Sequence, residues 1–437
     1  MRRKGYRLMS RPPRSGFVDD WYPSGLDHIW LPYAQMKTAP APLPVVRTDG
    51  TRIHLADGRA LVDGIASWWT GCHGYNHPHI RQAVQRQLEI MPHVMFGGLV
   101  HEQPLTLARR LAQMLPGDLD RVFFTDSGSV AVEVAMKMAI QYWLNLGETT
   151  RDTFLCFRGG YHGDTLATMA VSDDSGMHRA FAGVLKRHVM ADLPADDASE
   201  AALAALLERE APRLAGIIVE PLVQGAGGMR FHDPSVLTRL RSLADRYGLL
   251  LIFDEIFTGF GRTGTMFACQ RAGVVPDILT LSKALTGGTL PLAATVARRR
   301  IFDAFWSDDP MAALMHGPTY MANALACAAA NASLDLFEDG ERLRHVARIE
   351  EWLTAGLEPS RDLPGVTDVR VRGAIGVVEL ERIDDLAALR SAFVEKGAFI
   401  RPIGNVIYLT PALTIGEEDV AYLTRVIGEV LRDFAAR

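Results

Sequence analysis

Three short polar motifs in this sequence each follow an apolar run and carry residue types that can do chemistry. The first is residues 125–129 (TDSGS), directly after an apolar run that ends at Phe124. Small residues let the backbone approach a ligand, and the first turn of a helix presents free N–H groups and a positive dipole end to an anion. Gly128 and Ser129 are therefore candidates for binding a phosphate, although an ordinary helix cap uses the same residue types.

The second motif is an acidic pair, Asp254 and Glu255, at the end of the apolar run 249–253. A carboxylate beside a buried strand is costly unless it has a partner. Asp254 is suited to hold a protonated pyridine nitrogen, which would preserve an electron sink. A helix cap or a structural ion pair explains the two residues equally well when they are taken alone.

The third motif is a lysine followed by small residues, at 281–288 (LSKALTGG). Lys283 comes directly after a predicted strand, where its side chain can project into a crevice. Burial and neighbouring charge lower the pKa of a lysine in such a place, and its neutral amine can then attack a carbonyl carbon. Because a single lysine is nearly always a solvated surface charge, this interpretation depends on the other two motifs.

Together the three motifs supply an anion cradle, a carboxylate and a nucleophilic amine, each after a different predicted strand. Pyridoxal 5'-phosphate needs these groups at its phosphate, its ring nitrogen and its aldehyde. The combination is far more specific than any one of its members. It predicts a pyridoxal-phosphate enzyme in which Lys283 binds the cofactor as a Schiff base.

The segments that must position these motifs alternate between strand-like and helical patterns. Helical patterns cover, among others, residues 129–143 and 234–247. Several strand-like runs are apolar throughout, as expected for strands that are covered on both faces. The alternation predicts an α/β fold with a mostly parallel sheet, whose ligands gather at the carboxyl ends of the strands. The predicted strands are 121–124, 153–157, 216–219, 249–253 and 278–281.

The pattern changes after about residue 331, where helices and strands predict a smaller α+β domain. Short strands with turns between residues 45 and 66 are expected to complete it. We therefore predict an N-terminal segment 1–66 that contributes to the small domain, a large cofactor-binding domain 67–330, and a C-terminal small domain 331–437. The predicted C-terminal elements are helices at 340–357, 386–396 and 416–436, and strands at 375–380 and 405–409.

The composition is that of an ordinary globular protein of 437 residues, with 48% hydrophobic and 22% charged residues. A formal net charge of -5 provides no basic surplus to attract nucleic acid or an anionic membrane. The four cysteines are far apart and form no CxxC pair, so we predict no metal site and a reducing, cytoplasmic location. Residues 1–20 lack the apolar stretch of a secretory signal and are expected to form a frayed tail.

From residue 28 onward, the sequence resembles class III aminotransferases of pyridoxal-phosphate fold type I. The tandem tryptophans, the lysine motif and an HGPT segment all match that family. A general aminotransferase would be expected to match the lysine motif alone. The further segments that carry the resemblance are 67–70 (SWWT), 73–78 (HGYNHP), 93–98 (HVMFGG), 158–165 (RGGYHGDT), 223–229 (VQGAGGM), 259–264 (GFGRTG), 315–319 (MHGPT) and 400–402 (IRP).

The resemblance implies roles for individual residues. Lys283 would hold the cofactor and then move the substrate α-proton, and Asp254 would keep the ring nitrogen protonated. Tyr161 would stack on the cofactor ring and complete the catalytic set. Pro318 and Thr319 would reach the cofactor phosphate across a homodimer, so that two chains share each site.

The substrate pocket is expected to be an apolar tunnel that ends at an arginine. Tyr33 and Trp68 would line it, and Arg401 would bind a substrate carboxylate with its two-pronged fork. Gly317 would also contact the substrate. Arg262 is interpreted as a further carboxylate contact or a structural contact, and the histidines at 73, 162 and 316 as hydrogen-bonded structural residues. The predicted substrate set is Tyr33, Trp68, Tyr161, Lys283, Gly317 and Arg401.

The subgroup that these segments resemble implies a ping-pong transamination in biotin synthesis. S-adenosylmethionine would be the amino donor and 8-amino-7-oxononanoate the acceptor, giving 7,8-diaminononanoate. Within the family, lysine or an ω-amino acid as donor, or an aminomutase, remains an alternative, as does a cofactor-binding regulator without turnover. A non-catalytic nucleotide-binding module is disfavoured, because the sequence has no GxxxxGK[ST] and no GxGxxG that opens a helix after a strand.

Overall fold

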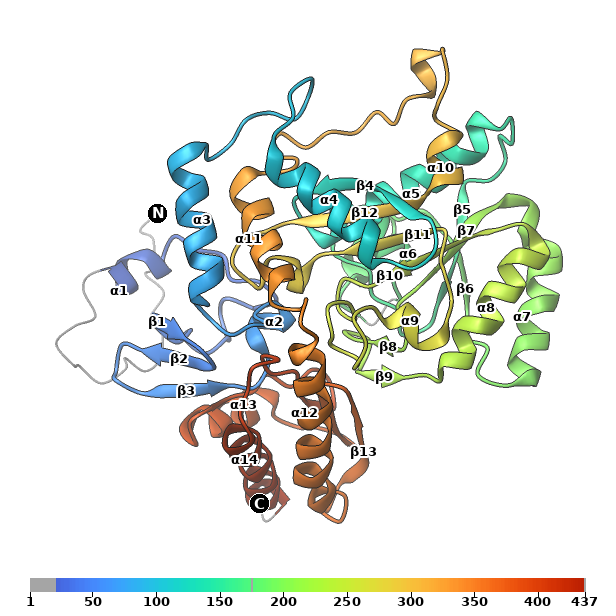
Figure 1. Cartoon of the computed structure of the whole chain (residues 1–437). Helices are drawn as coiled ribbons and strands as arrows, with labels where there is room; N and C mark the ends of the chain where they lie inside the picture. The colour runs from blue at the N-terminus through green and yellow to red at the C-terminus, as the bar shows by residue number, and fades with distance from the viewer. Residues whose placement is uncertain (1–20, 174–175, 436–437) are drawn as a thin grey trace, which may run out of the picture.

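The computed structural model describes residues 21–173 and 176–435, and it is built around a seven-stranded sheet (Figure 1). Neighbouring strands pair in parallel except at β12, which runs antiparallel to both β11 and β4. The predicted α/β fold with a mostly parallel sheet is therefore confirmed, while β6 and β12 were not predicted. In spatial order the strands are β4 (Leu119–Thr125), β12 (Ala293–Arg298), β11 (Ile278–Leu281), β10 (Leu250–Asp254), β7 (Leu214–Val219), β5 (Thr153–Phe157) and β6 (Val189–Ala191).

The central strands are buried on both faces, which explains their continuous apolar sequences. All the residues of β5, β7 and β10 are buried. Along β10, Leu251 and Phe253 pack into one hydrophobic cluster and Leu250 and Ile252 into another, as the two-residue period of a strand requires. Each face of the sheet therefore has its own core, and only the strand ends are open to ligands.

Helices and short connecting elements surround this sheet in Figure 1. The helix α5, which begins directly after β4, packs against β11 and β12 as well as β4. The helices of this part are α3 (Pro78–Ile90), α4 (Glu102–Met114), α5 (Gly128–Asn145), α6 (Leu166–Val171), α7 (Asp197–Glu210), α8 (Pro234–Tyr247), α9 (Ala268–Ala272), α10 (Arg299–Asp303) and α11 (Ala324–Asp335). No helix within 21–173 or 176–435 is long and apolar enough to cross a membrane.

The C-terminal part forms a separate layer at the bottom of Figure 1. The division of the chain into domains stays a prediction, as does the state of residues 1–20, which lie outside the described residues. The elements here are α12 (Glu341–Leu357), β13 (Val366–Arg372), β14 (Ile375–Leu380), α13 (Leu386–Glu395), β15 (Ala398–Phe399), β16 (Val406–Leu409) and α14 (Glu417–Ala435).

The N-terminal strands join this C-terminal part through a mixed sheet. It contains β1 (Val45–Asp49), β2 (Arg52–Leu55) and β3 (Ala60–Asp63), and β15 adds to it in parallel beside β3. Arg52 of β2 also forms an ion pair of 2.6 Å with Asp419 of α14. Chain segments more than 300 residues apart are thereby held together.

Candidate active site

The three motifs predicted from the sequence meet in one cavity. The strands β4, β11 and β10 run in the same direction, so their carboxyl ends lie at one edge of the sheet. A cavity of about 210 Å³ at this edge is lined by residues from all three motifs, by the tyrosine of the segment 158–165, and by their neighbours. Its lining includes Gly128, Ser129, Tyr161, Asp254 and Lys283.

The N-terminus of α5 forms the wall of this cavity that suits an anion. Ser127 caps the helix, its Oγ accepting a hydrogen bond from the backbone N–H of Val130 at 3.4 Å. A Cβ at Gly128 would lie 2.9 Å from Ile256, so a larger residue would not fit there without movement. The remaining free N–H groups of the first turn and the positive end of the dipole fit a phosphate.

Another wall of the cavity is formed by the carboxylate of Asp254, which is buried and forms hydrogen bonds through both of its oxygens. Its Oδ2 lies 2.7 Å from Nδ1 of His162, and its Oδ1 accepts from Thr280 at 3.3 Å and from the backbone N–H of Ile256 at 3.1 Å. His162 was predicted to be a hydrogen-bonded structural residue. It is hydrogen-bonded, but it also lines the cavity and orients the carboxylate.

A second acid, Glu220, lies in the same cavity and was missed in the sequence analysis. It accepts hydrogen bonds from the backbone N–H groups of Tyr161 and Gly225, both at 2.9 Å. Burial raises the pKa of Glu220 to about 7, because the charged form of the carboxyl group is poorly solvated there. The signal that was available is its position directly after the buried strand β7.

Lys283 begins the short helix after β11 and lines the floor of the cavity. Burial lowers the pKa of Lys283, while the charges of Asp254 and Glu220 oppose this shift. Its Nζ lies 4.9 Å from the centre of the Trp69 ring. A lysine amine whose pKa is lowered in a largely apolar site is suited to act as a nucleophile and proton carrier.

A larger cavity of about 580 Å³ adjoins the first and shares Trp69, Tyr161, Ala226 and Lys283 with it. Most of the predicted substrate residues line it. The guanidinium of Arg401 lies 5.4 Å from the Trp68 ring centre, and the Trp68 and Tyr33 rings meet edge to face. The remaining lining residues are Met177, Arg390, Ile403 and Gly404.

Three predicted site residues lie elsewhere in the structure. Gly317, Pro318 and Thr319 are on the connection between α10 and α11 and line neither cavity. Arg262 is fully buried and donates from Nη1 to the carbonyl oxygens of Ala374 at 3.1 Å and Pro411 at 2.7 Å. Two roles were considered for Arg262, and these contacts agree with the structural one.

Comparison with known proteins identifies the family. The class III aminotransferase family model matches residues 33–431. Two relatives named adenosylmethionine-8-amino-7-oxononanoate aminotransferase cover 92% of this chain. The one from Mycobacterium leprae (strain TN) is 46% identical over 413 residues, 94% of its length. The one from Buchnera aphidicola subsp. Acyrthosiphon pisum (strain APS) is 44% identical over 412 residues, 96% of its length.

The chain belongs to the class III aminotransferase family. Solved structures agree with this assignment. An enzyme of the same name from Methanocaldococcus jannaschii DSM 2661 has a TM-score of 0.89 and 31% identity, with 94% of this chain and 98% of that one covered. An amine transaminase from an uncultivated Pseudomonas species, solved in its PLP-bound form, has a TM-score of 0.86 and 33% identity, with 93% and 98% covered. The predicted family and fold type I are confirmed.

The tandem tryptophans of this aminotransferase stand on a strained turn. Residues 66–69 all have positive φ, between 45° and 76°, although none is glycine. This conformation costs about 1–2 kcal/mol per residue, so the surroundings must enforce it. Asp63 does so by accepting from the backbone N–H groups of Ile65 at 2.9 Å and Ser67 at 3.0 Å, and from the Tyr75 hydroxyl at 2.6 Å.

Two of the residues that line the larger cavity, Tyr33 and Tyr161, form a hydrogen-bonded group with Asp164. Tyr33 donates its hydroxyl hydrogen bond to Asp164, and its oxygen lies 3.4 Å from that of Tyr161. Burial raises the pKa of both tyrosines, and the nearby Asp164 raises both pKa values further. The two hydroxyl groups therefore remain neutral hydrogen-bond donors. Asp164 was not predicted as a site residue, although it lies in the segment 158–165 that matches the family.

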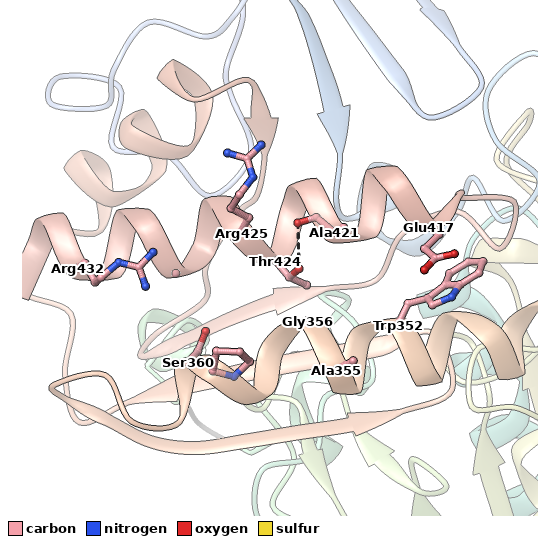
Figure 2. A pocket seen from close by; sticks show the side chains of 11 residues that line it. Trp352, Ala355, Gly356, Ser360, Glu417, Ala421, Thr424, Arg425 and Arg432 are labelled. Carbon is pink, nitrogen blue, oxygen red and sulfur yellow. Dashed lines mark hydrogen bonds between the residues drawn. The ribbon is translucent and has the colours of Figure 1, made fainter.

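A hollow of about 450 Å³ between α12 and α14 is separate from this site (Figure 2). Figure 2 shows Trp352 and Glu417 at one end of it and Arg432 towards the other. The Thr424 hydroxyl donates to the carbonyl oxygen of Ala421 at 3.2 Å. None of the predicted site residues lines this hollow.

Gly163 provides a test of how tightly the aminotransferase site is packed. Its φ is +130°, and an added Cβ would lie 2.1 Å from Oγ of Ser129. We expect Gly163→Ala to weaken cofactor binding at least about tenfold and to destabilise the fold by about 1–3 kcal/mol through overpacking. Absorption titration and thermal unfolding measure the two effects. Gly183→Ala, where a Cβ meets nothing within 4 Å, is the control and should change neither.

Proposed function

We propose that this aminotransferase uses pyridoxal 5'-phosphate to transfer an amino group from S-adenosylmethionine to 8-amino-7-oxononanoate, a step of biotin synthesis. The observation that carries the proposal is that Lys283 and Arg401 line the same cavity, whose walls also carry the rings of two tyrosines and two tryptophans. A keto acid with a long aliphatic chain would place its carbonyl at the cofactor that Lys283 would hold, its carboxylate at Arg401 and its chain along the walls. The names of the relatives support the same substrate pair.

The residues of the smaller cavity fit the cofactor. The N-terminus of α5 at Gly128 and Ser129 would hold the phosphate, Asp254 the ring nitrogen, Tyr161 the ring and Lys283 the aldehyde. Pyridoxal phosphate, when bound, supplies an electron sink for the negative charge that develops at the substrate α-carbon. These residues support the fit because the anion cradle, the carboxylate and the amine that the cofactor needs all line a single cavity.

The side chains of this protein would carry out the proton transfers. Lys283, once free, would take the α-proton on Nζ and return it, acting as base and then as acid. His162 would keep Asp254 oriented through the 2.7 Å contact between Nδ1 and Oδ2. Arg401 would bind the acceptor carboxylate, and the tandem tryptophans would exclude water from its chain.

We further propose that two chains assemble into a homodimer that completes each site. Figure 1 shows the connection between α10 and α11 running as an extended arm along one side of the molecule. Large apolar residues on this arm are exposed, among them Trp306 at 79% and Met315 at 71%. Exposed apolar surface of this kind marks an interface. In a dimer, Gly317 and Thr319 on the arm would reach the partner's cavities.

The proposed location is the cytoplasm. All four cysteines, Cys72, Cys156, Cys269 and Cys327, are free and buried. Burial raises the pKa of the thiol groups of Cys72, to about 11, and of Cys156, to about 12, which keeps them protonated and unreactive. Thiols of this kind, without any disulfide among the described residues, suit a reducing compartment.

The first test is the addition of S-adenosylmethionine alone to the purified yellow enzyme. The absorption band of the lysine-bound cofactor is expected to disappear, and the band of its aminated form to appear, with a yield of about one amino group per site. Adding 8-amino-7-oxononanoate should then reverse the spectrum. If lysine or an ω-amino acid bleaches the protein and S-adenosylmethionine does not, the proposed donor is wrong and the alternative within the family replaces it.

A further inference from the structure

A second arginine lines the larger cavity, and the sequence analysis did not consider it. Arg390 lies on α13, and both it and Arg401 contribute to the cavity wall. Neither has a carboxylate partner among the described residues. Two unpaired guanidinium groups in one largely apolar cavity repel each other, and a bound anion would relieve that repulsion.

Arg390 is held in place by its own contacts. Its Nη2 donates to the carbonyl oxygen of Pro402 at 2.8 Å, and Pro402 directly follows Arg401 in the chain. Its Nε is buried and has no hydrogen-bond partner within the described part of the chain. Burial lowers the pKa of Arg390, and the positive charge of Arg401, which lines the same cavity, lowers it further.

We propose that Arg390 binds the substrate carboxylate together with Arg401, so that each arginine takes one carboxylate oxygen. This inference rests on the proposed function, since it concerns the carboxylate end of the same keto acid. A carboxylate has about four acceptor positions and can bind two guanidinium groups at once. Arg390 is thus a specificity-determining residue that favours substrates with a distal carboxylate over neutral ones.

The experiment compares the binding of nonanoate and nonanamide to the holoenzyme by calorimetry. The two probes share the chain and differ only in charge at one end. Arg390→Gln should reduce the preference for nonanoate about tenfold, because Gln retains an amide donor for Pro402 but loses the charge. Arg390→Lys should restore part of the preference. Arg382→Gln is the control, since Arg382 is 78% exposed and paired with Asp384.

The outcomes separate this inference from the proposed function. An unchanged preference in Arg390→Gln, or equal weakening of both probes, would overturn the role of Arg390. A wild-type holoenzyme without any preference would overturn that role together with the carboxylate site of the proposed function. A preference that depends on Arg390, in an enzyme that does not use S-adenosylmethionine or 8-amino-7-oxononanoate, would support the inference and reject only the substrate pair.

Discussion

Replacing Lys283 with alanine is expected to lower kcat by at least about 10,000-fold, which removes multiple turnover. Lys283 lines both cavities, and in the proposed function it acts both as the nucleophile that holds the cofactor and as the base and acid that moves the proton. Acid–base catalysis alone contributes about 10²–10⁴-fold, and loss of the covalent step adds to this. Steady-state assay of the purified variant, together with its absorption spectrum, measures both effects.

The control for this variant is Lys186→Ala. Lys186 is a surface lysine paired with Asp152 at 2.7 Å, and its loss should leave turnover close to that of the wild type. A small primary amine added to Lys283→Ala should restore a fraction of the activity, because it can replace the missing Nζ as a base. Turnover of Lys283→Ala within tenfold of the wild type would contradict the role assigned to Lys283.

Replacing Asp277 with asparagine is expected to destabilise the protein by about 1.5–3 kcal/mol, since it removes a buried negative charge that accepts charge-assisted hydrogen bonds from partly exposed arginines. Asp277 is fully buried directly before β11, the strand that positions Lys283. Its carboxylate lies 3.0 Å from Arg241 and 2.6 Å from Arg300, with Arg298 at 3.6 Å. Denaturant unfolding at a fixed protein concentration measures the loss.

Asp245→Asn is the matched control for this prediction. Asp245 contacts the same Arg241 at 2.6 Å but is largely exposed, so its loss should cost less than about 1 kcal/mol. An equal effect of the two substitutions would show that the buried cluster has no special importance.

The pH dependence of the Asp277 variant provides a second check. Burial alone would raise the pKa of Asp277, but the charges of Arg241 and Arg300 outweigh it and the pKa is lowered. A group with a lowered folded-state pKa stabilises the fold above its unfolded-state pKa, and this stabilisation is lost as the pH falls through the folded-state value. The difference between wild type and Asp277→Asn should therefore be largest near neutral pH and shrink below about pH 4.

The candidate site could be predicted to a large extent because its main residues follow buried strands. Asp254 ends β10 and Lys283 follows β11, and both strands were recognised from continuous apolar runs. Parallel strands place their carboxyl ends at one edge, so residues recognised separately were expected to meet. Gly128 and Ser129 joined them for the same reason, although the antiparallel strand β12 between β4 and β11 was not predicted.

Other contacts could not be predicted, because they join segments that are distant in the chain. Tyr33 and Asp164 are 131 residues apart, and neither carries a local sign of its partner. Asp63 supports the tryptophan turn through backbone N–H groups, which any sequence would provide. Arg390 has the pattern of an ordinary residue on an amphipathic helix, and only the placement of α13 brings it to the cavity wall.

The sequence by itself determined the fold class, the family and the three chemical groups, since strand periodicity and short motifs are local properties of the chain. The tertiary structure alone decided which of the remaining polar residues share a cavity with those groups. It placed His162 behind Asp254 and Arg390 beside Arg401, and it left Gly317 and Thr319 outside both cavities. The physical reason is that the packing of elements distant in the chain determines which polar side chains reach the cavity, although these side chains look alike in the sequence.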